Sequence, residues 1–238
     1  MKQIILNHID VEIWNNLHVQ FQPHSDVNII MGSNGSGKTT FLRNLYLSLA
    51  EDKESKDHII YLPSIDNIAL RDKRKTSNAL SQELDYYIYD MKTGPSLMSL
   101  RMSMLDSSEE KRIEMKAKIA DFQKIINDFF AITGKRIEIE GSKFSVLTDT
   151  GVLPVEALSS GEKQILLILL RVFLLNGNEA IVMIDEPTYS LDIEWQFKLV
   201  TMFTHLNNKA QYFIASLSPA LFGKGWGDKV WYMDQITK

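Results

Sequence analysis

The sequence predicts an α/β fold, and two stretches of the chain carry this prediction. Residues 27–31, apolar except for Asn28, are typical of a short buried strand, a glycine-rich loop follows, and Thr40 to Leu45 begins a helix. A second apolar run at 181–184 ends in two carboxylates. Strand–loop–helix units of this kind build α/β proteins. With 238 residues, of which 45% are hydrophobic, the chain is long enough to form a full α/β core.

The other elements follow from local pattern, in chain order. Strands are expected at 2–7, 17–22, 27–31, 58–63, 181–184, 212–216 and 229–233. A helix is expected at 38–50, then a charged loop at 52–57, and mostly helix from 78 to 133. Within 109–132 a helical face is predicted from apolar residues at these positions: Ile113, Ala117, Ala120, Ile125, Phe129 and Ile132. Residues 136–147 alternate as a hairpin around Gly141.

The glycine-rich loop matches the pattern G-x-x-x-x-G-K-[ST] at every fixed position. Its residues are Gly32, Ser33, Asn34, Gly35, Ser36, Gly37, Lys38 and Thr39. Backbone N–H groups of such a loop surround a β-phosphate, and the N-terminus of the following helix adds partial positive charge. Lys38 is expected to reach the β- and γ-phosphate oxygens, and the Thr39 hydroxyl to bind Mg²⁺. This P-loop, together with Thr40, is the predicted binding site for ATP and Mg²⁺.

The two carboxylates after the 181–184 strand suit phosphoryl transfer. Asp185 would hold Mg²⁺ through its water shell, and Glu186 would polarise the attacking water. Glu186 and Lys38 are therefore the predicted catalytic residues.

The motif Leu158-Ser159-Ser160-Gly161-Glu162 precedes a long apolar helix. Ser159 is placed to cap that helix, and Glu162 completes a capping box. A capped helix start with Gly161 in its first turn can bind an anion such as a γ-phosphate; alternatively, it only caps a buried helix. The apolar run is short and interrupted by Arg171, which indicates a core helix and argues against membrane insertion.

Together these motifs resemble the heads of ABC-type ATPases, which include transporter nucleotide-binding subunits and the SMC chromosome proteins. The resemblance implies a P-loop NTPase fold of the ABC type, with a mixed core sheet flanked by helices. It implies a single ATPase domain over 1–238, with a small helical insert at 76–135. It also implies an ATP-dependent homodimer, or a higher assembly of dimers, in which two heads sandwich two ATP molecules. Ser159, Gly161 and Glu162 would then contact the ATP of the other subunit, and Asp192 would lie along the dimer interface.

The sequence departs from these relatives at three places. The insert is too short for the long coiled coil of SMC proteins, and no glutamine follows the 58–63 strand as it does in transporter subunits. Tyr61-Leu62-Pro63-Ser64 is more similar to soluble ATPases of bacterial defence systems, such as those of Septu and retron operons and the overcoming-lysogenization-defect ATPases. Leu217 stands where most relatives have a histidine that touches the γ-phosphate. Because leucine donates no hydrogen bond, slow hydrolysis is expected.

The sequence therefore predicts an ATP-binding and ATP-hydrolysing ABC-type ATPase that regulates a separate effector protein, a nuclease or toxin, in anti-phage defence. One alternative is the nucleotide-binding subunit of an ABC transporter, and another is an SMC-like DNA-repair ATPase. The net charge of −4 gives no overall attraction for nucleic acid. Basic residues at 71–75 and 111–118 could contact nucleic-acid phosphates or form solvated faces. The absence of cysteine and of a signal peptide fits a cytoplasmic protein.

Overall fold

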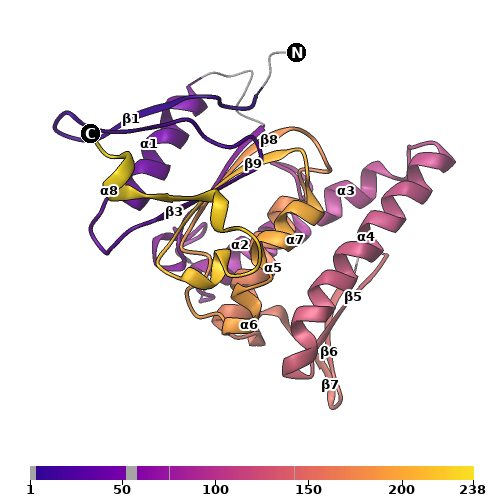
Figure 1. Cartoon of the computed structure of the whole chain (residues 1–238). Coiled ribbons are helices and arrows are strands. Elements are labelled where there is room, and N and C mark those ends of the chain that lie inside the picture. The colour runs from indigo at the N-terminus through magenta and orange to yellow at the C-terminus, as the bar shows by residue number, and fades with distance from the viewer. Residues whose placement is uncertain (1–3, 52–57, 75, 142) are drawn as a thin grey trace. The chain divides into compact units, whose positions relative to one another are not determined.

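The computed structural model describes residues 4–51, 58–74, 76–141 and 143–238 (Figure 1). The predicted charged loop at 52–57 lies outside these residues. The chain divides into two compact units, one formed by residues 1–67 and 175–238 and the other by residues 68–174. The insert predicted at 76–135 falls within the second unit.

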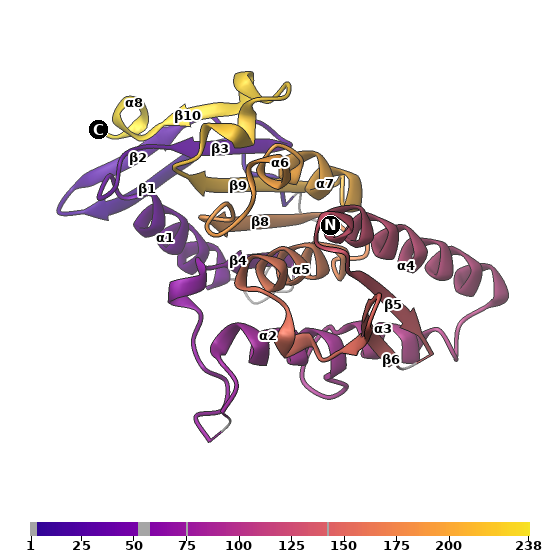
Figure 2. The same cartoon turned by 90° about the horizontal axis from the view of Figure 1, so that it is seen from below.

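The first unit is built on a five-stranded parallel sheet with the order β10-β3-β9-β8-β4. Its strands run side by side in Figure 2. They are β3 (Val27–Met31), β4 (Ile59–Leu62), β8 (Ala180–Asp185), β9 (Ala210–Ser216) and β10 (Val230–Tyr232). The predicted α/β class is confirmed. Antiparallel pairing is found outside this sheet, for example between β1 (Ile9–Trp14) and β2 (Leu17–Phe21).

Helices cover the sheet on both faces. Helix α1 (Lys38–Ala50) contributes Phe41 and Leu42 to a core that also contains Phe213 of β9. Because successive side chains of a strand point to opposite faces, Tyr212 lies on the other side. There its hydroxyl donates to the carbonyl of Phe203 in α7 (Leu199–Leu206) at 2.7 Å. Two short helices complete the unit, α6 (Ile193–Gln196) and α8 (Met233–Ile236).

The carboxyl ends of three adjacent strands place the predicted site. The P-loop follows β3, Glu186 follows β8 and Leu217 follows β9. The N–H of Glu186 donates to the carbonyl of Ala215 at 2.9 Å, which joins two of these strand ends. In parallel α/β sheets, ligands bind at this edge.

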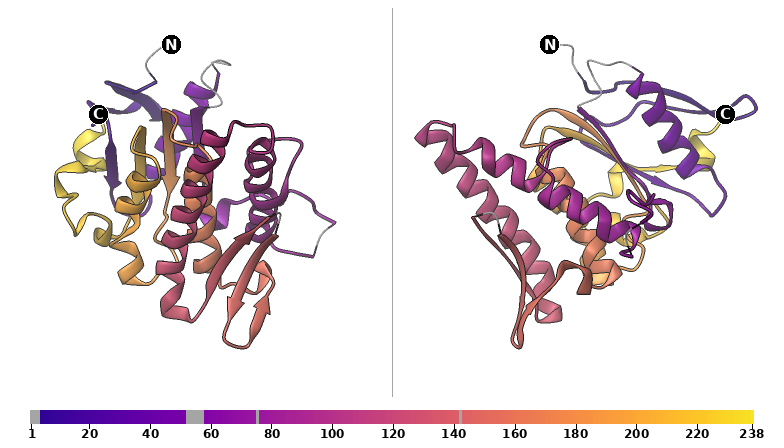
Figure 3. Two further views of the ribbon diagram at one scale, coloured as in Figure 1. Left: turned by 90° about the vertical axis from the view of Figure 1, so that its right-hand side faces the viewer. Right: turned by 180° about the vertical axis from the view of Figure 1, so that it is seen from behind.

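The second unit consists of helices and a small antiparallel sheet (Figure 3). Its helices are α2 (Ala79–Tyr89), α3 (Leu97–Ser103), α4 (Glu109–Phe130) and α5 (Ser160–Phe173). The predicted hairpin is confirmed as β5 (Arg136–Glu140) and β6 (Lys143–Thr148), and β7 (Gly151–Leu153) adds a third strand. Helix α4 packs on β5 and on α5. No helix among the described residues combines the length and the apolar character needed to span a membrane.

The strand predicted at 2–7 is wrong for its described part, because residues 4–7 form no strand. The first strand begins at Ile9 instead. Its side chains alternate between buried and exposed, with Ile9, Val11 and Ile13 facing the core. This period-2 pattern is the signal of a half-buried strand, whereas the preceding apolar run lacks alternation.

The helical face predicted for α4 is also partly wrong. Ile125 and Phe129 are buried, but Ile113 is 60% exposed, and Ile132, just beyond the helix, is 64% exposed. The buried face is formed by Ile119, Phe122, Ile125, Ile126, Phe129 and Phe130. These residues run from the middle of α4 to its end, where neighbouring elements cover the helix.

Candidate nucleotide site

The first unit contains a cavity of about 730 Å³ at the carboxyl edge of the sheet. The P-loop residues 34–40 form one side of it, and Glu186, Leu217 and Ser218 form another. Six lining residues were not predicted from the sequence: Trp14, Thr188, Tyr189, Ile193, Gln196 and Ser218. Trp14 is 44% exposed, and its ring can stack on a ring of a bound molecule.

The P-loop backbone has the shape that its glycines allow. Gly37 has a φ of 95°, and a Cβ added there would lie 3.0 Å from the Trp14 ring. Lys38 is 6% exposed, and its Nζ donates to the carbonyls of Gly32 at 2.9 Å and Ser33 at 3.2 Å. The Ser36 hydroxyl is buried and finds no hydrogen-bond partner among the described residues. A phosphate oxygen in the loop would satisfy this donor, so the loop fits a phosphorylated ligand.

Thr39 and Asp185 form the predicted metal-binding pair. The Thr39 hydroxyl lies 2.9 Å from Oδ2 and 3.1 Å from Oδ1 of Asp185, which is 1% exposed. Burial raises the pKa of Asp185, and the neighbouring Glu186 carboxylate raises it further. A cation would offset both effects. A hydroxyl beside a carboxylate also supplies the oxygen ligands that Mg²⁺ prefers, so these residues fit Mg²⁺.

Glu186 is held in place by its own backbone and by two neighbours. Its φ of 47° lies in the left-handed region, which is unusual for a residue other than glycine. Oε2 accepts the backbone N–H of Leu217 at 3.2 Å, and Oε1 lies 3.7 Å from Lys38 Nζ. The carboxylate is therefore oriented beside the P-loop lysine.

Leu217 lies in the cavity wall and is 46% exposed, so its side chain does not belong to the core. The residues before and after it, Ser216 and Ser218, make hydrogen bonds. The Ser218 hydroxyl donates to Gln196 Oε1 at 2.6 Å, and the hydroxyls of Thr188 and Ser216 lie 2.9 Å apart. The side chain at the predicted histidine position is apolar, but its backbone N–H contacts the predicted catalytic carboxylate.

The predicted capping box of α5 is present in the second unit. Ser159 Oγ accepts the Glu162 N–H at 3.2 Å, and Glu162 Oε2 accepts the Ser159 N–H at 2.8 Å. Ser159 and Ser160 are exposed, whereas Gly161 is buried. Asp192, in the first unit, is exposed and caps the short helix α6.

Glu162, which the sequence predicts to contact ATP, has a buried side chain in this structure. Glu162 is 1% exposed, and its carboxylate also accepts hydrogen bonds from Thr133 and Lys135. Burial alone would raise its pKa, but these hydrogen bonds outweigh burial and hold the pKa below its ordinary value. Glu162 is thus an internal structural anion, which leaves Ser159 and Ser160 as the exposed residues of the motif.

Known proteins share sequence or fold with this chain. The family described as RecF/RecN/SMC N-terminal domain matches residues 5–235. The DNA replication and repair protein RecF of Nitrosococcus oceani is 44% identical over 43 residues, which span 18% of this chain and 12% of RecF.

Two solved structures show the same fold at low sequence identity. An Smc head bound to the C-winged helix domain of ScpA aligns with a TM-score of 0.55 and 13% identity, over 91% of this chain and 90% of that one. A Pyrococcus furiosus Smc head, with an extended coiled coil and bound to the C-terminal domain of ScpA, aligns with a TM-score of 0.51 and 12% identity, over 92% and 91%. The chain therefore belongs to the RecF/RecN/SMC N-terminal domain family, and its fold is that of an Smc head.

Proposed function

We propose that this protein binds ATP with Mg²⁺ in the P-loop cavity and hydrolyses it slowly. The observation that carries the proposal is the meeting of four side chains at one sheet edge. Lys38 lies 3.7 Å from Glu186, and Thr39 is hydrogen-bonded to Asp185. A cation, a metal-binding pair and a carboxylate base are the groups that phosphoryl transfer requires.

Each residue has a separate task in the proposed reaction. Lys38 and the P-loop N–H groups would bind the phosphates, and Thr39 and Asp185 would hold Mg²⁺. The bound metal ion would neutralise charge on the phosphate oxygens. Glu186 would accept a proton from the attacking water at Oε1, while the Leu217 N–H keeps Oε2 in place. The new bond joins this water oxygen to the γ-phosphorus, and the bond to the ADP oxygen breaks.

The Leu217→His variant tests why hydrolysis would be slow. The site is open to the cavity, so an imidazole there would not need to be buried, and we expect an unchanged melting temperature. Single-turnover hydrolysis should rise by less than about tenfold, because the surrounding residues are not arranged for a histidine. Leu217→Met serves as the apolar control. A lower melting temperature with unchanged hydrolysis would contradict this assignment.

We further propose that two copies associate head to tail around ATP. The cavity rim carries exposed apolar side chains, with Tyr189 at 57%, Ile193 at 51% and Leu217 at 46% exposure. The start of α5 provides a capped helix N-terminus with exposed Ser159 and Ser160. Such an N-terminus attracts anions, so we assign it to the γ-phosphate of ATP bound by the other copy.

The Ser160→Glu variant separates helix stability from ATP contact. An acidic residue in a first turn favours a helix, so the melting temperature should stay equal or rise slightly. The same charge would repel the γ-phosphate of ATP on the opposing copy. Self-association of two copies in the presence of ATP and Mg²⁺ should therefore weaken by about tenfold or more. Sedimentation velocity measures the association, and titration of the monomer should show unchanged ATP affinity. Ala79→Glu, in the first turn of α2, is the matched control. If Ser160→Glu associates like the wild type, the start of α5 is not the contact.

For the biological role, we propose that ATP-dependent association regulates a separate cytoplasmic effector, a nuclease or toxin of a defence system. The support is the resemblance at Tyr61-Leu62-Pro63-Ser64. Co-purification of the chain expressed with its neighbouring genes tests this proposal. Recovery of a permease instead would favour the transporter alternative. If addition of ATP releases the effector from the complex or recruits it to the complex, ATP regulates the effector's binding.

The match to RecF favours a second candidate role in DNA repair. The two basic clusters give this role little support, because several of their residues are paired internally. Arg71 pairs with Glu83 at 2.8 Å, Arg74 with Asp72 at 3.0 Å and Lys118 with Glu114 at 2.8 Å. Stimulation of ATP turnover by duplex DNA, decreasing with added salt, would favour the repair role.

A further inference from the structure

The buried carboxylate of Glu162 joins three segments of the second unit. Oε1 accepts the Thr133 hydroxyl at 2.7 Å, and Lys135 Nζ lies 2.8 Å from Oε1 and 3.0 Å from Oε2. Oε2 also accepts the Ser159 N–H at 2.8 Å. Thr133 ends the 3₁₀ turn (Ala131–Thr133) that follows α4, and Lys135 immediately precedes β5. The first turn of α5 is therefore bonded to the segment that leaves α4.

This contact exceeds what a helix cap requires. The capping box needs only Ser159 and Glu162, whereas Lys135 adds a charge-assisted pair in which Glu162 is 1% exposed and the lysine side chain 20% exposed. Removing one partner would leave a buried unpaired charge, so the geometry of the turn depends on both.

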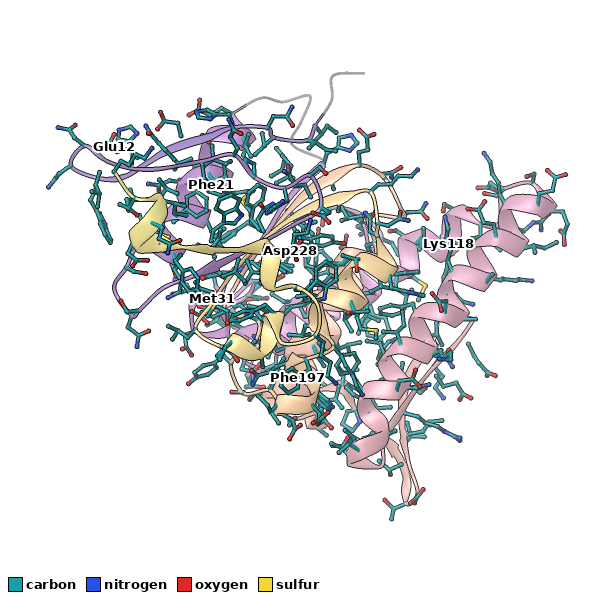
Figure 4. The ribbon with its side chains drawn as sticks, in the orientation of Figure 1. Glu12, Phe21, Met31, Lys118, Phe197 and Asp228 are labelled. Atoms are coloured by element: carbon teal, nitrogen blue, oxygen red, sulfur yellow. The ribbon has the colours of Figure 1, made fainter. Side chains whose placement is uncertain are left out.

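A second contact joins α4 to the opposite end of α5. The rings of Phe122 in α4 and Phe173 in α5 stack with their centroids 4.6 Å apart. Helix α5 is thus held near both ends, by aromatic packing on α4 at one end and by the ion pair with Lys135, just before β5, at the other. The first half of α4 is only partly covered, and Lys118 projects from it in Figure 4.

We infer that Lys135 is a positioning residue, which acts through Glu162 to hold the first turn of α5 ready to contact the phosphate of ATP on a second copy. This inference rests on the proposed ATP-dependent association. The positioning itself can be measured without ATP, so the two ideas can be separated.

The test compares Lys135→Met and Lys135→Arg with the wild type. In Lys135→Met, amide hydrogen exchange at Glu162 and Lys163 should accelerate by about tenfold or more relative to Leu169 and Leu170 in the same helix. Self-association of two copies in the presence of ATP and Mg²⁺ should weaken by about tenfold to a hundredfold, the factor for losing a charged hydrogen bond. The affinity of the monomer for ATP should be unchanged. Lys135→Arg should restore both. Lys124→Met, which breaks an exposed pair with Asp128 on α4, is the control and should change neither.

The outcomes separate the positioning role of Lys135 from the proposed self-association. Amide exchange that accelerates uniformly along α5, or self-association of Lys135→Met like that of the wild type, would overturn the positioning role. Amide exchange that accelerates only at the first turn of α5, together with a wild type that does not self-associate in the presence of ATP, would support the positioning role and refute the proposed association. If Lys135→Met does not fold, Thr133→Val removes one donor to Glu162 and should give the same local pattern at smaller amplitude.

Discussion

The Glu186→Gln variant is expected to bind ATP normally and to lose nearly all hydrolysis, with a fall of about 10²- to 10⁴-fold. The amide keeps the shape of the carboxylate and an oxygen for the Leu217 N–H, but it cannot take a proton from water. Single-turnover hydrolysis and nucleotide titration measure the two effects. With hydrolysis blocked, the ATP-loaded pair should accumulate, which light scattering detects.

Glu194→Gln is the matched control for this variant. Glu194 is exposed on α6 and does not line the cavity, so its loss should leave turnover unchanged. Hydrolysis by Glu186→Gln at the wild-type rate would show that another group activates the water.

The second large effect is expected for Lys38→Ala. Loss of this ammonium should weaken ATP binding by about an order of magnitude or more, since a hydrogen bond to a charged group contributes roughly 1.5–3 kcal/mol. Lys38 Nζ also bonds the carbonyls of Gly32 and Ser33, so the loop itself should become less rigid. Isothermal titration with ATP and Mg²⁺ measures the change.

Lys198→Ala, at an exposed lysine of the same unit, is the control for this variant. The melting temperature must show that Lys38→Ala is folded. An unchanged affinity in the folded variant would contradict the assignment of the P-loop.

The elements that carry the candidate site could be predicted because their signals are local. The P-loop is a contiguous motif between a buried strand and a helix, and the strand before Asp185 is buried at every position. Asp185 and Thr39, 146 residues apart in the sequence, were each predicted to hold Mg²⁺, and the parallel strands that precede them end at the same sheet edge, where the two side chains meet.

The parts that were missed depend on tertiary contacts. Glu162 fits a capping box and a ligand motif equally well in sequence, and its other partners, Thr133 and Lys135, lie 29 and 27 residues away. Gln196 reaches the cavity from a four-residue helix that has no periodic signal. The contact from Leu217 to Glu186 is made by a backbone N–H, which no residue type reveals.

At Glu186 the backbone lies in the left-handed region, which glycine adopts without a steric penalty. Replacing Glu186 by glycine would relieve about 1–2 kcal/mol of backbone strain. It would also cost roughly 0.5–1 kcal/mol in chain entropy and about 0.5–1.5 kcal/mol for the lost contact with Leu217. These contributions nearly cancel, so the melting temperature of Glu186→Gly should stay close to that of the wild type. A library scored for folding alone would therefore retain inactive proteins at this position, and only a screen for turnover would remove them.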